Sequence, residues 1–144
     1  MIRQATAEDS AIVAELAMLL WPDNNFDLLE KEFQKVNAEE GVFIFLEKDM
    51  AVAFAHCSLR HDYVEGTESS PVGYLEGIYV KDEYRNKGIA KKLVAECEKW
   101  AKEQGCSEFA SDCELDNTDS LKFHLKIGFQ EANRIIAFTK KLYR

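Results

Sequence analysis

The sequence lacks the features that would mark it as disordered, membrane-spanning or secreted. Only 2 of its 144 residues are proline and 47% are apolar, which is the composition of a compact folded chain. No apolar run approaches the roughly 20 residues needed to cross a bilayer. The segment from Met1 to Glu8 lacks a basic stretch followed by an apolar one, so no secretory signal is visible. We therefore expect one globular domain, residues 1–144, in the cytoplasm.

Patterns typical of metal binding are also missing. The four cysteines include no C-x-x-C pair, and the three histidines form no ligand cluster, so we expect no metal ion. Cys57 and Cys97 fall at apolar positions of a predicted strand and a predicted helix, where a free cysteine acts as a small hydrophobic side chain. Free thiols fit a reducing, cytoplasmic compartment.

Basic residues are fewer than acidic residues in this chain. The chain has 26 acidic and 18 basic residues, and its formal net charge is −8. An acidic chain repels the phosphates of nucleic acids and attracts cationic ligands. We therefore expect a cationic small molecule as the partner, and neither nucleic acid nor membrane.

Strands and helices are predicted to interleave along the chain, which gives a mixed α/β sheet. Apolar residues at every second position predict strands near residues 2–4, 42–46, 51–59, 74–80 and 106–112. Helical spacing and capping residues predict helices that begin near Thr6, Phe26, Ile89 and Asn117. Asp9 is the expected acidic partner of Thr6, and Gly128 is expected to end the last helix. The helix after Gly88 is expected to have one apolar face, with Ile89, Leu93, Val94, Cys97 and Trp100. Residues 60–71 form a polar loop of a length that is usually functional or mobile. Residues 130–143 are expected to form two short strands or one bent strand pair.

The strand at residues 74–80 is followed by a short loop, Gly88 and a helix. Exposed backbone N–H groups at such a helix start bind a phosphate or pyrophosphate. Gly88 lets the backbone approach a ligand, and Arg85 and Lys87 add positive charge. Neither G-x-x-x-x-G-K-[ST] nor G-x-G-x-x-G occurs here. The residues by themselves therefore fit either a phosphate site or an ordinary strand-to-helix connection.

The motif Arg85-x-x-Gly88-x-Ala90 resembles the coenzyme A pyrophosphate loop of the GNAT superfamily of N-acetyltransferases. The resemblance covers nearly the whole chain. Five further segments make it closest to the small aminoglycoside 6′-N-acetyltransferases of resistant bacteria: Trp21-Pro22, Arg60-His-Asp-Tyr63, Ser69-Ser-Pro71, Leu75-Glu-Gly-Ile78 and Ala110-Ser-Asp112. The resemblance implies acetyl transfer from acetyl-CoA to the 6′-amino group of an aminoglycoside antibiotic. The amine would attack the thioester directly in a ternary complex, and the enzyme would be a homodimer.

The same resemblance implies a fold and a cofactor site. The fold would be one α/β (α+β) GNAT-like domain, with a mixed, mostly antiparallel sheet and about four helices. The sheet would splay between the parallel strands at residues 74–80 and 107–112, and acetyl-CoA would lie in that gap. The pantetheine arm would contact the backbone of Ile78, Tyr79 and Val80 and the side chain of Asn117. The pyrophosphate would be held by backbone amides of Asn86, Lys87, Gly88, Ile89, Ala90 and Lys91.

Two carboxylates are the candidates for acid–base work and for holding the acceptor. Glu76 interrupts an otherwise hydrophobic strand, which is a costly place for a charge that does nothing. Aligned with the family, Glu76 and Asp112 lie at matching depths on the two parallel strands. We expect both to bind acceptor ammonium groups and Glu76 to accept a proton from the reacting amine. The alternative for each is a carboxylate that only meets solvent.

Aromatic residues are predicted to complete the acceptor site. Trp21, at the end of a helix before Pro22, and Tyr63, in the long polar loop, would form its walls. A core aromatic is the alternative for Trp21. Glu65 and Glu68 of the same loop either face a cationic ligand or are simply solvated.

This sequence departs from the family pattern at two positions. His124 stands where many members place a tyrosine that protonates the leaving thiolate, and it either takes that role or only bonds to a helix backbone group. Asn133 stands where the subfamily often has a glutamate that contacts aminoglycoside. Asn133 can hydrogen-bond the acceptor but cannot neutralise an ammonium.

Two other functions are compatible with the same residues. The chain can be a housekeeping acetyltransferase for a polyamine, a peptide N-terminus or a lysine. It can also be a regulatory module that binds acetyl-CoA without turnover. A module of that kind is expected to lose Glu76 or Gly88, and this chain keeps both.

Overall fold

A five-stranded mixed sheet organises the first of two compact units, Met1–Asp112. The computed structural model describes residues 1–143. The strands lie in chain order across the sheet: β1 (Ile2–Gln4), β2 (Glu40–Glu47), β3 (Met50–Arg60), β4 (Val72–Val80) and β5 (Phe109–Ala110). The first four pair antiparallel, whereas β4 and β5 are parallel. The expected fold class is therefore confirmed.

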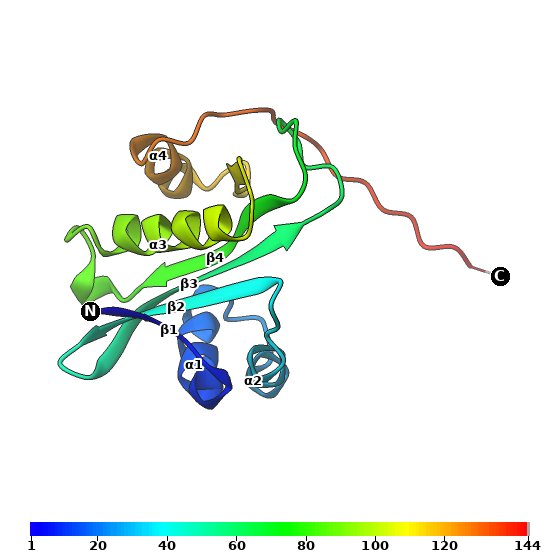
Figure 1. Cartoon of the computed structure of the whole chain (residues 1–144). Helices are drawn as coiled ribbons and strands as arrows, with labels where there is room; N and C mark the ends of the chain where they lie inside the picture. Colours follow the sequence, from blue (N-terminus) through cyan, green and yellow to red (C-terminus); the bar gives the residue numbers. More distant parts are fainter. Residues whose placement is uncertain (144) are drawn as a thin grey trace. The chain divides into compact units, whose positions relative to one another are not determined.

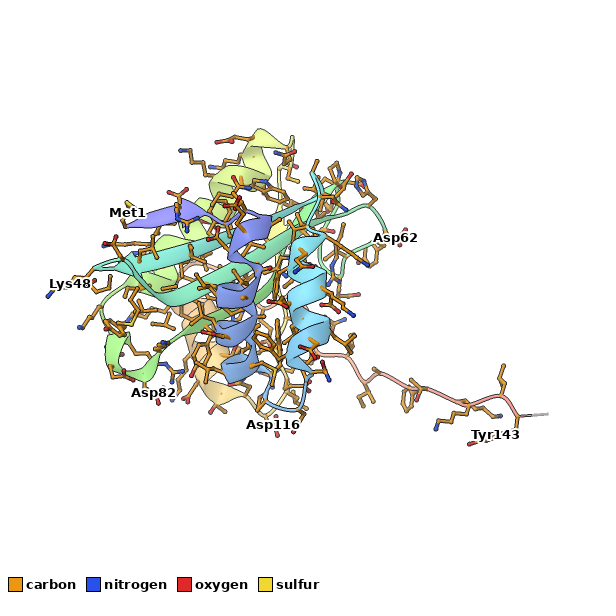
Figure 2. The ribbon with its side chains drawn as sticks, turned by 90° about the horizontal axis from the view of Figure 1, so that it is seen from below. Met1, Lys48, Asp62, Asp82, Asp116 and Tyr143 are labelled. Atoms are coloured by element: carbon orange, nitrogen blue, oxygen red, sulfur yellow. The ribbon has the colours of Figure 1, made fainter. Side chains whose placement is uncertain are left out.

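Helices cover both faces of this sheet. α1 (Ser10–Leu20), which follows the short 3-10 turn η1 (Ala7–Asp9), packs with α2 (Phe26–Gln34) on one face. α3 (Ile89–Glu103), which follows the 3-10 turn η2 (Asp82–Tyr84), covers the other face against β2, β3 and β4 (Figure 1). α1 and α2 lie side by side across the strands (Figure 2).

Each face of the sheet has its own apolar layer. Phe54 of β3 is fully buried and meets the edge of the Phe33 ring, with the ring centroids 6.3 Å apart. Leu93, Cys97 and Trp100 of α3 are buried on the opposite face. Their spacing of three and four residues matches the helical face expected from the sequence.

The second unit begins at Cys113 and contains one helix, α4 (Thr118–Lys126). The Asn117 side chain caps this helix by accepting a hydrogen bond from the Ser120 N–H at 3.1 Å. Gly128 follows the helix with φ of 106°, a left-handed conformation that glycine adopts readily. The predicted start and glycine stop of this helix are confirmed.

Two strand predictions were wrong in extent. The strand expected over residues 106–112 is reduced to Phe109–Ala110, because it pairs with β4 only through Gly73 and Tyr74. The strands expected over residues 130–143 are absent: these residues have no strand assignment, and the exposed fraction of Phe138 is 87%. An alternating apolar pattern becomes a strand only where a neighbouring strand supplies hydrogen bonds.

The entry to α1 is fixed by Asp9. Its carboxylate accepts the Thr6 backbone N–H at 2.8 Å and both guanidinium nitrogens of Arg3 at 2.8 Å. The predicted pairing of Thr6 with Asp9 is thus confirmed, at the 3-10 turn before the helix. The Arg3 hydrogen bond is the main reason why the pKa of Asp9 falls to about 2, although burial opposes it.

Asp9→Asn should lower the free energy of unfolding by about 1–2 kcal/mol at pH 7, because a charge-assisted cap is lost. The Asp9 pKa is depressed in the folded state, so its stabilisation is present above its ordinary value of 3.8 and disappears as the pH falls toward about 2. Urea unfolding across this range measures the difference between variant and wild type. Glu8→Gln, at an exposed position of the same turn, is the control. A difference that stays the same size down to pH 2 would contradict the ionic account.

Candidate active site

The sheet opens beyond Tyr74. β4 and β5 pair only at Gly73 with Phe109 and at Tyr74 with Ala110, so residues 75–80 of β4 have β3 on one side and no strand of the described chain on the other. The splay expected from the family resemblance is confirmed. It leaves one edge of β4 available to a ligand.

Backbone groups at this edge alternate in direction along β4. The Lys81 N–H donates to the Val52 carbonyl at 2.9 Å, and Val80 lies opposite Ala53. In an antiparallel ladder this register turns the backbone of Tyr79 toward β3 and the backbones of Ile78 and Val80 toward the open side. The expected pantetheine contacts therefore fit the backbone of Ile78 and the N–H of Val80, whose carbonyl accepts from Arg85 Nε. The backbone of Tyr79 is held in the sheet.

Arg85 has a structural role in the loop after β4. Its Nε donates to the Val80 carbonyl at 2.8 Å, and its Nη1 lies 2.9 Å from Asp82 Oδ1. Its guanidinium carbon also stands 5.2 Å from the Tyr79 ring centroid. Asp82 already neutralises the charge of Arg85, which was expected to face a phosphate. Arg85 therefore holds the loop in shape.

Gly88 begins α3 in a left-handed conformation, with φ of +79°, and no side chain caps the helix start. The first hydrogen bond of the helix runs from the Lys92 N–H to the Gly88 carbonyl at 3.1 Å. The N–H groups of residues 89–91 therefore point out of the helix start, where the helix dipole favours an anion. A Cβ on Gly88 would meet nothing within 4 Å, so conformation is what requires glycine here.

Glu76 is held by two residues of β3. Its Oε2 accepts from the Ser58 hydroxyl and from Arg60 Nε at 3.1 Å, and its Oε1 accepts from Arg60 Nη2 at 2.8 Å. Partial burial alone raises the pKa of this carboxyl. The hydrogen bonds from Arg60 and Ser58 outweigh burial, so the pKa of Glu76 lies below its ordinary value.

Asp112 is joined to the same group of residues through Tyr74. The Tyr74 hydroxyl donates to Asp112 Oδ2, and the Arg60 guanidinium carbon lies 3.5 Å from the centre of the Tyr74 ring. Burial, and then the bond to Asp112, raises the pKa of Tyr74 well above its ordinary value, so the phenol keeps its proton. The two carboxylates expected to act together are therefore connected, by residues that we did not expect from the sequence.

A large acidic cavity lies beside Glu76. It has a volume of about 1090 Å³ and is lined by α2, the end of α1 and the adjoining strand residues, including Trp21, Ser58 and Glu76. Four more carboxylates line it: Asp23, Glu32, Glu39 and Glu40. The Glu40 carboxylate is 2.8 Å from His56 Nε2, and the Glu39 carboxylate is 2.9 Å from His61 Nε2. A cavity of this charge suits a cation that carries several positive groups.

Trp21 both lines this cavity and belongs to the core. Its ring meets the edge of Phe54, with the centroids 6.5 Å apart. A Cβ added to Gly77 would stand 2.6 Å from its Cη2 atom, so the absence of a side chain at Gly77 lets the indole lie against β4. The two roles considered for Trp21 are therefore compatible.

The other predicted residues lie apart from this cavity or in the second unit. Tyr63 is 75% exposed in the loop before β4 and is absent from the cavity lining. In the second unit, His124 Nδ1 is 2.7 Å from the Ser120 carbonyl, the backbone contact considered as its alternative role. Asn133 Oδ1 accepts from the Arg134 N–H at 2.8 Å.

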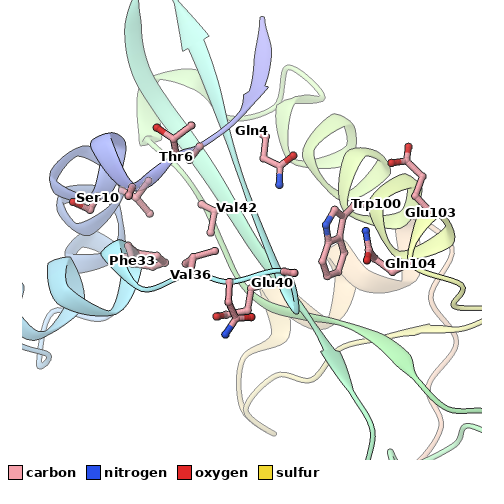
Figure 3. A pocket seen from close by; sticks show the side chains of 15 residues that line it. Gln4, Thr6, Ser10, Phe33, Val36, Glu40, Val42, Trp100, Glu103 and Gln104 are labelled. Carbon is pink, nitrogen blue, oxygen red and sulfur yellow. The ribbon is translucent and has the colours of Figure 1, made fainter.

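A second cavity, of about 530 Å³, contains none of the residues predicted for the site. It lies between the start of the chain, the segment before β2 and the end of α3, with Gln4, Glu40, Trp100 and Gln104 around it (Figure 3). Because it adjoins the C-terminal end of α3, it is removed from the open helix start at Gly88. The cavity beside Glu76 is therefore the candidate active site.

The residues missed from the sequence are Ser58, Arg60 and Tyr74, together with the four additional carboxylates of the cavity. Alternation along β3 places Ser58 and Arg60 on one face. That Glu76 is the partner of both residues could not be predicted, because the β3–β4 register shifts between His56 and Cys57. Within residues 1–143, no group of histidine, cysteine and acidic residues is placed to hold a metal ion, and no helix is long and apolar enough to cross a membrane.

An open strand edge followed by an uncapped helix start offers one ligand both backbone hydrogen-bond partners and an anion site. The model of the acetyltransferase (GNAT) family matches residues 10–129, and the chain belongs to that family.

Its relatives point to one branch of the family. The chain is 42% identical to aminoglycoside N(6′)-acetyltransferase type 1 of Stenotrophomonas maltophilia, over 98% of this chain and 93% of the relative. It is 41% identical to the enzyme of the same name in Serratia marcescens, over 88% and 89%. The solved structure of AAC(6′)-Iy with the bisubstrate analog CoA-S-monomethyl-acetylneamine superposes with a TM-score of 0.92 at 37% identity, covering 99% of this chain and 98% of that one.

Gly88→Val should weaken acetyl-CoA binding at least tenfold, because valine cannot hold φ near +79° without strain and its side chain would stand where the pyrophosphate approaches. Gly105→Val is a matched control: Gly105 also has a left-handed φ, +92°, and open space, but lies at the other end of α3. Calorimetry with acetyl-CoA and circular dichroism of both variants test this assignment. Equal affinities in the two folded variants would show that the loop does not bind the cofactor.

Proposed function

We propose that this protein is an aminoglycoside 6′-N-acetyltransferase that uses acetyl-CoA and thereby gives resistance to aminoglycoside antibiotics. The observation that carries this proposal is the acidic cavity lined by Glu76, a residue of the part of β4 that has no strand on its open side. Relatives with that activity, at about 40% identity over nearly the whole chain, support it. Because the family match runs from residue 10 to residue 129, across both units, we treat the chain as one catalytic domain.

Acetyl-CoA fits residues of the open edge and the helix start. The amides of residues 86–91 would hold the pyrophosphate, as the uncapped start of α3 favours an anion. Backbone groups of Ile78 and Val80 would bind the pantetheine arm, with Asn117 as a further contact. A backbone N–H of β4 beside the thioester oxygen would stabilise the charge that develops there.

The acceptor would bind through its ammonium groups. Asp23, Glu32, Glu39 and Glu40 line the same cavity as Glu76 and offer negative charge at several points of its wall. Trp21 gives that wall a flat apolar surface. Tyr63 and Asn133 remain proposed contacts, in which Asn133 would hydrogen-bond an uncharged group of the antibiotic.

Acetyl transfer would proceed by direct attack in a ternary complex. The amine nitrogen forms a bond to the thioester carbon and releases one proton to water, the carbon–sulfur bond breaks, and the thiolate leaves with the electron pair of that bond. Glu76 stays ionised at neutral pH, because its pKa is depressed. Its role would be to orient the reacting amine and to accept a hydrogen bond from it, directly or through one water. Asp112 would hold a second ammonium, and His124 would protonate the thiolate.

The homodimer expected from the family resemblance has support in the second unit. Its last residues expose a set of large apolar side chains, each at least 71% exposed: Ile135, Ile136, Phe138, Leu142 and Tyr143. We infer that a partner covers these side chains, because apolar surface exposed to this degree often marks an interaction site. Light scattering should give a mass twice that of the 16.5 kDa chain, and a monomer at micromolar concentration would contradict this part of the proposal.

The function is tested by release of coenzyme A thiol with two aminoglycosides that differ only in a 6′-amine or a 6′-hydroxyl. We expect turnover with the amine and none with the hydroxyl, and an acetyl group on the 6′-nitrogen in the NMR spectrum of the product. Spermidine and a lysine peptide belong in the same assay. Faster turnover with either would favour the housekeeping function, and binding of acetyl-CoA without turnover of any amine would favour the regulatory module.

Glu76→Gln should lower kcat/KM about tenfold to a hundredfold at every pH from about 6 to 9, because a charge-assisted hydrogen bond to the amine is lost. The depressed pKa of Glu76 means that its charge is lost only below its ordinary value of 4.5. An acidic limb in the wild-type profile of kcat/KM within this pH range should therefore lie at the same pH in Glu76→Gln. Asp112→Asn should act mainly on the acceptor KM. Loss of the acidic limb in Glu76→Gln would instead identify Glu76 as a base that titrates near neutrality.

A further inference from the structure

Arg60 contacts Glu76 and also the tyrosine that bonds Asp112. Its Nε and Nη2 bond the two oxygens of Glu76, and its guanidinium carbon lies 3.5 Å from the centre of the Tyr74 ring, whose hydroxyl bonds Asp112. With the Ser58 hydroxyl on Oε2 as well, three donors already surround Glu76. A carboxylate has about four acceptor positions, so Oε1 retains the one position that a substrate amine can use.

We propose that Arg60 is a positioning residue for acetyl transfer, which keeps Glu76 ionised and directs its remaining acceptor position at the reacting amine. The proposal rests on the proposed function, because it names the residue that prepares the acceptor site. Planar guanidinium groups suit this task, since two parallel hydrogen bonds fix both oxygens of a carboxylate at once. Stacking on Tyr74 fixes the guanidinium in turn.

The charges around Glu76 make Arg60 necessary. His56 and Arg60 of β3 favour the ionised form of Glu76. Other carboxylates line the same cavity: Glu32 of α2, Glu39 before β2, and Glu40 of β2, which is already bonded to His56. Asp112 is a further negative group, connected through Tyr74. Without Arg60, a half-buried Glu76 among these carboxylates would take up a proton at a higher pH.

Arg60→Met keeps the length of the side chain and removes its charge. We expect an acidic limb to appear in the pH profile of kcat/KM, because the pKa of Glu76 rises when the hydrogen bonds from Arg60 are lost. At pH 8 we expect kcat/KM to fall about tenfold, since Oε1 is no longer oriented. Arg60→Lys should restore the position of the limb but only part of the rate, because it supplies charge without the guanidinium fork.

Arg3→Met is the matched control, because Arg3 also makes a two-bond contact to a carboxylate, that of Asp9. It should lower stability and leave the pH profile unchanged. Combining Arg60→Met with Glu76→Gln should add little to the loss of Glu76→Gln alone, since Arg60 acts through Glu76.

Carboxyl ¹³C NMR of Glu76 without any acceptor separates this proposal from the proposed function. The Glu76 signal should titrate at higher pH in Arg60→Met than in wild type, whether or not aminoglycosides are the substrates. An unchanged titration and unchanged kcat/KM would show Arg60 to be merely structural. A lower acceptor KM in Arg60→Met would show that the arginine competes with the acceptor, and either result overturns the proposal.

Discussion

The pairing of β4 with β5 ends at Tyr74, and the arrangement of the site depends on that ending. Beyond this residue β4 is hydrogen-bonded to β3 on one side, and its other edge is not paired with any described strand. Because unpaired backbone groups in a half-buried position need partners, the open edge is prepared for a ligand with amide-like groups. Tyr74 is also the residue that bonds Asp112 and stacks with Arg60. The end of the sheet pairing and the connection between the carboxylates thus meet at one side chain.

Positive charge is used sparingly in this acidic chain. Arg85 pairs with Asp82 and donates to the Val80 carbonyl, and Arg60 pairs with Glu76. The proposed pyrophosphate site would therefore depend largely on backbone N–H groups and the dipole of α3. The cavity beside Glu76 keeps a surplus of carboxylates. In the proposed function, the two substrates would be separated by charge, since the anionic one would meet backbone dipoles and the cationic one acidic side chains.

Local patterns made most of the fold predictable. Thr6 with Asp9, the helical face of Leu93 and Cys97, and the stop at Gly128 all follow from spacing along the chain. Contacts between distant segments did not follow. The partnership of Arg60 with Glu76 depends on a shift in the β3–β4 register, and the length of β5 depends on where two parallel strands diverge. Neither is written in a local pattern.

The central claim is that acetyl-CoA binds the open edge of β4. Amide hydrogen exchange with and without acetyl-CoA tests this claim most directly. Exchange should slow at Ile78 and Val80 and at the amides of residues 86–91, which face the open edge and the start of α3. Exchange at Ile44, in the middle of β2, should not change. Slower exchange at Gln4 and Gln104 instead, around the smaller cavity, would contradict the account.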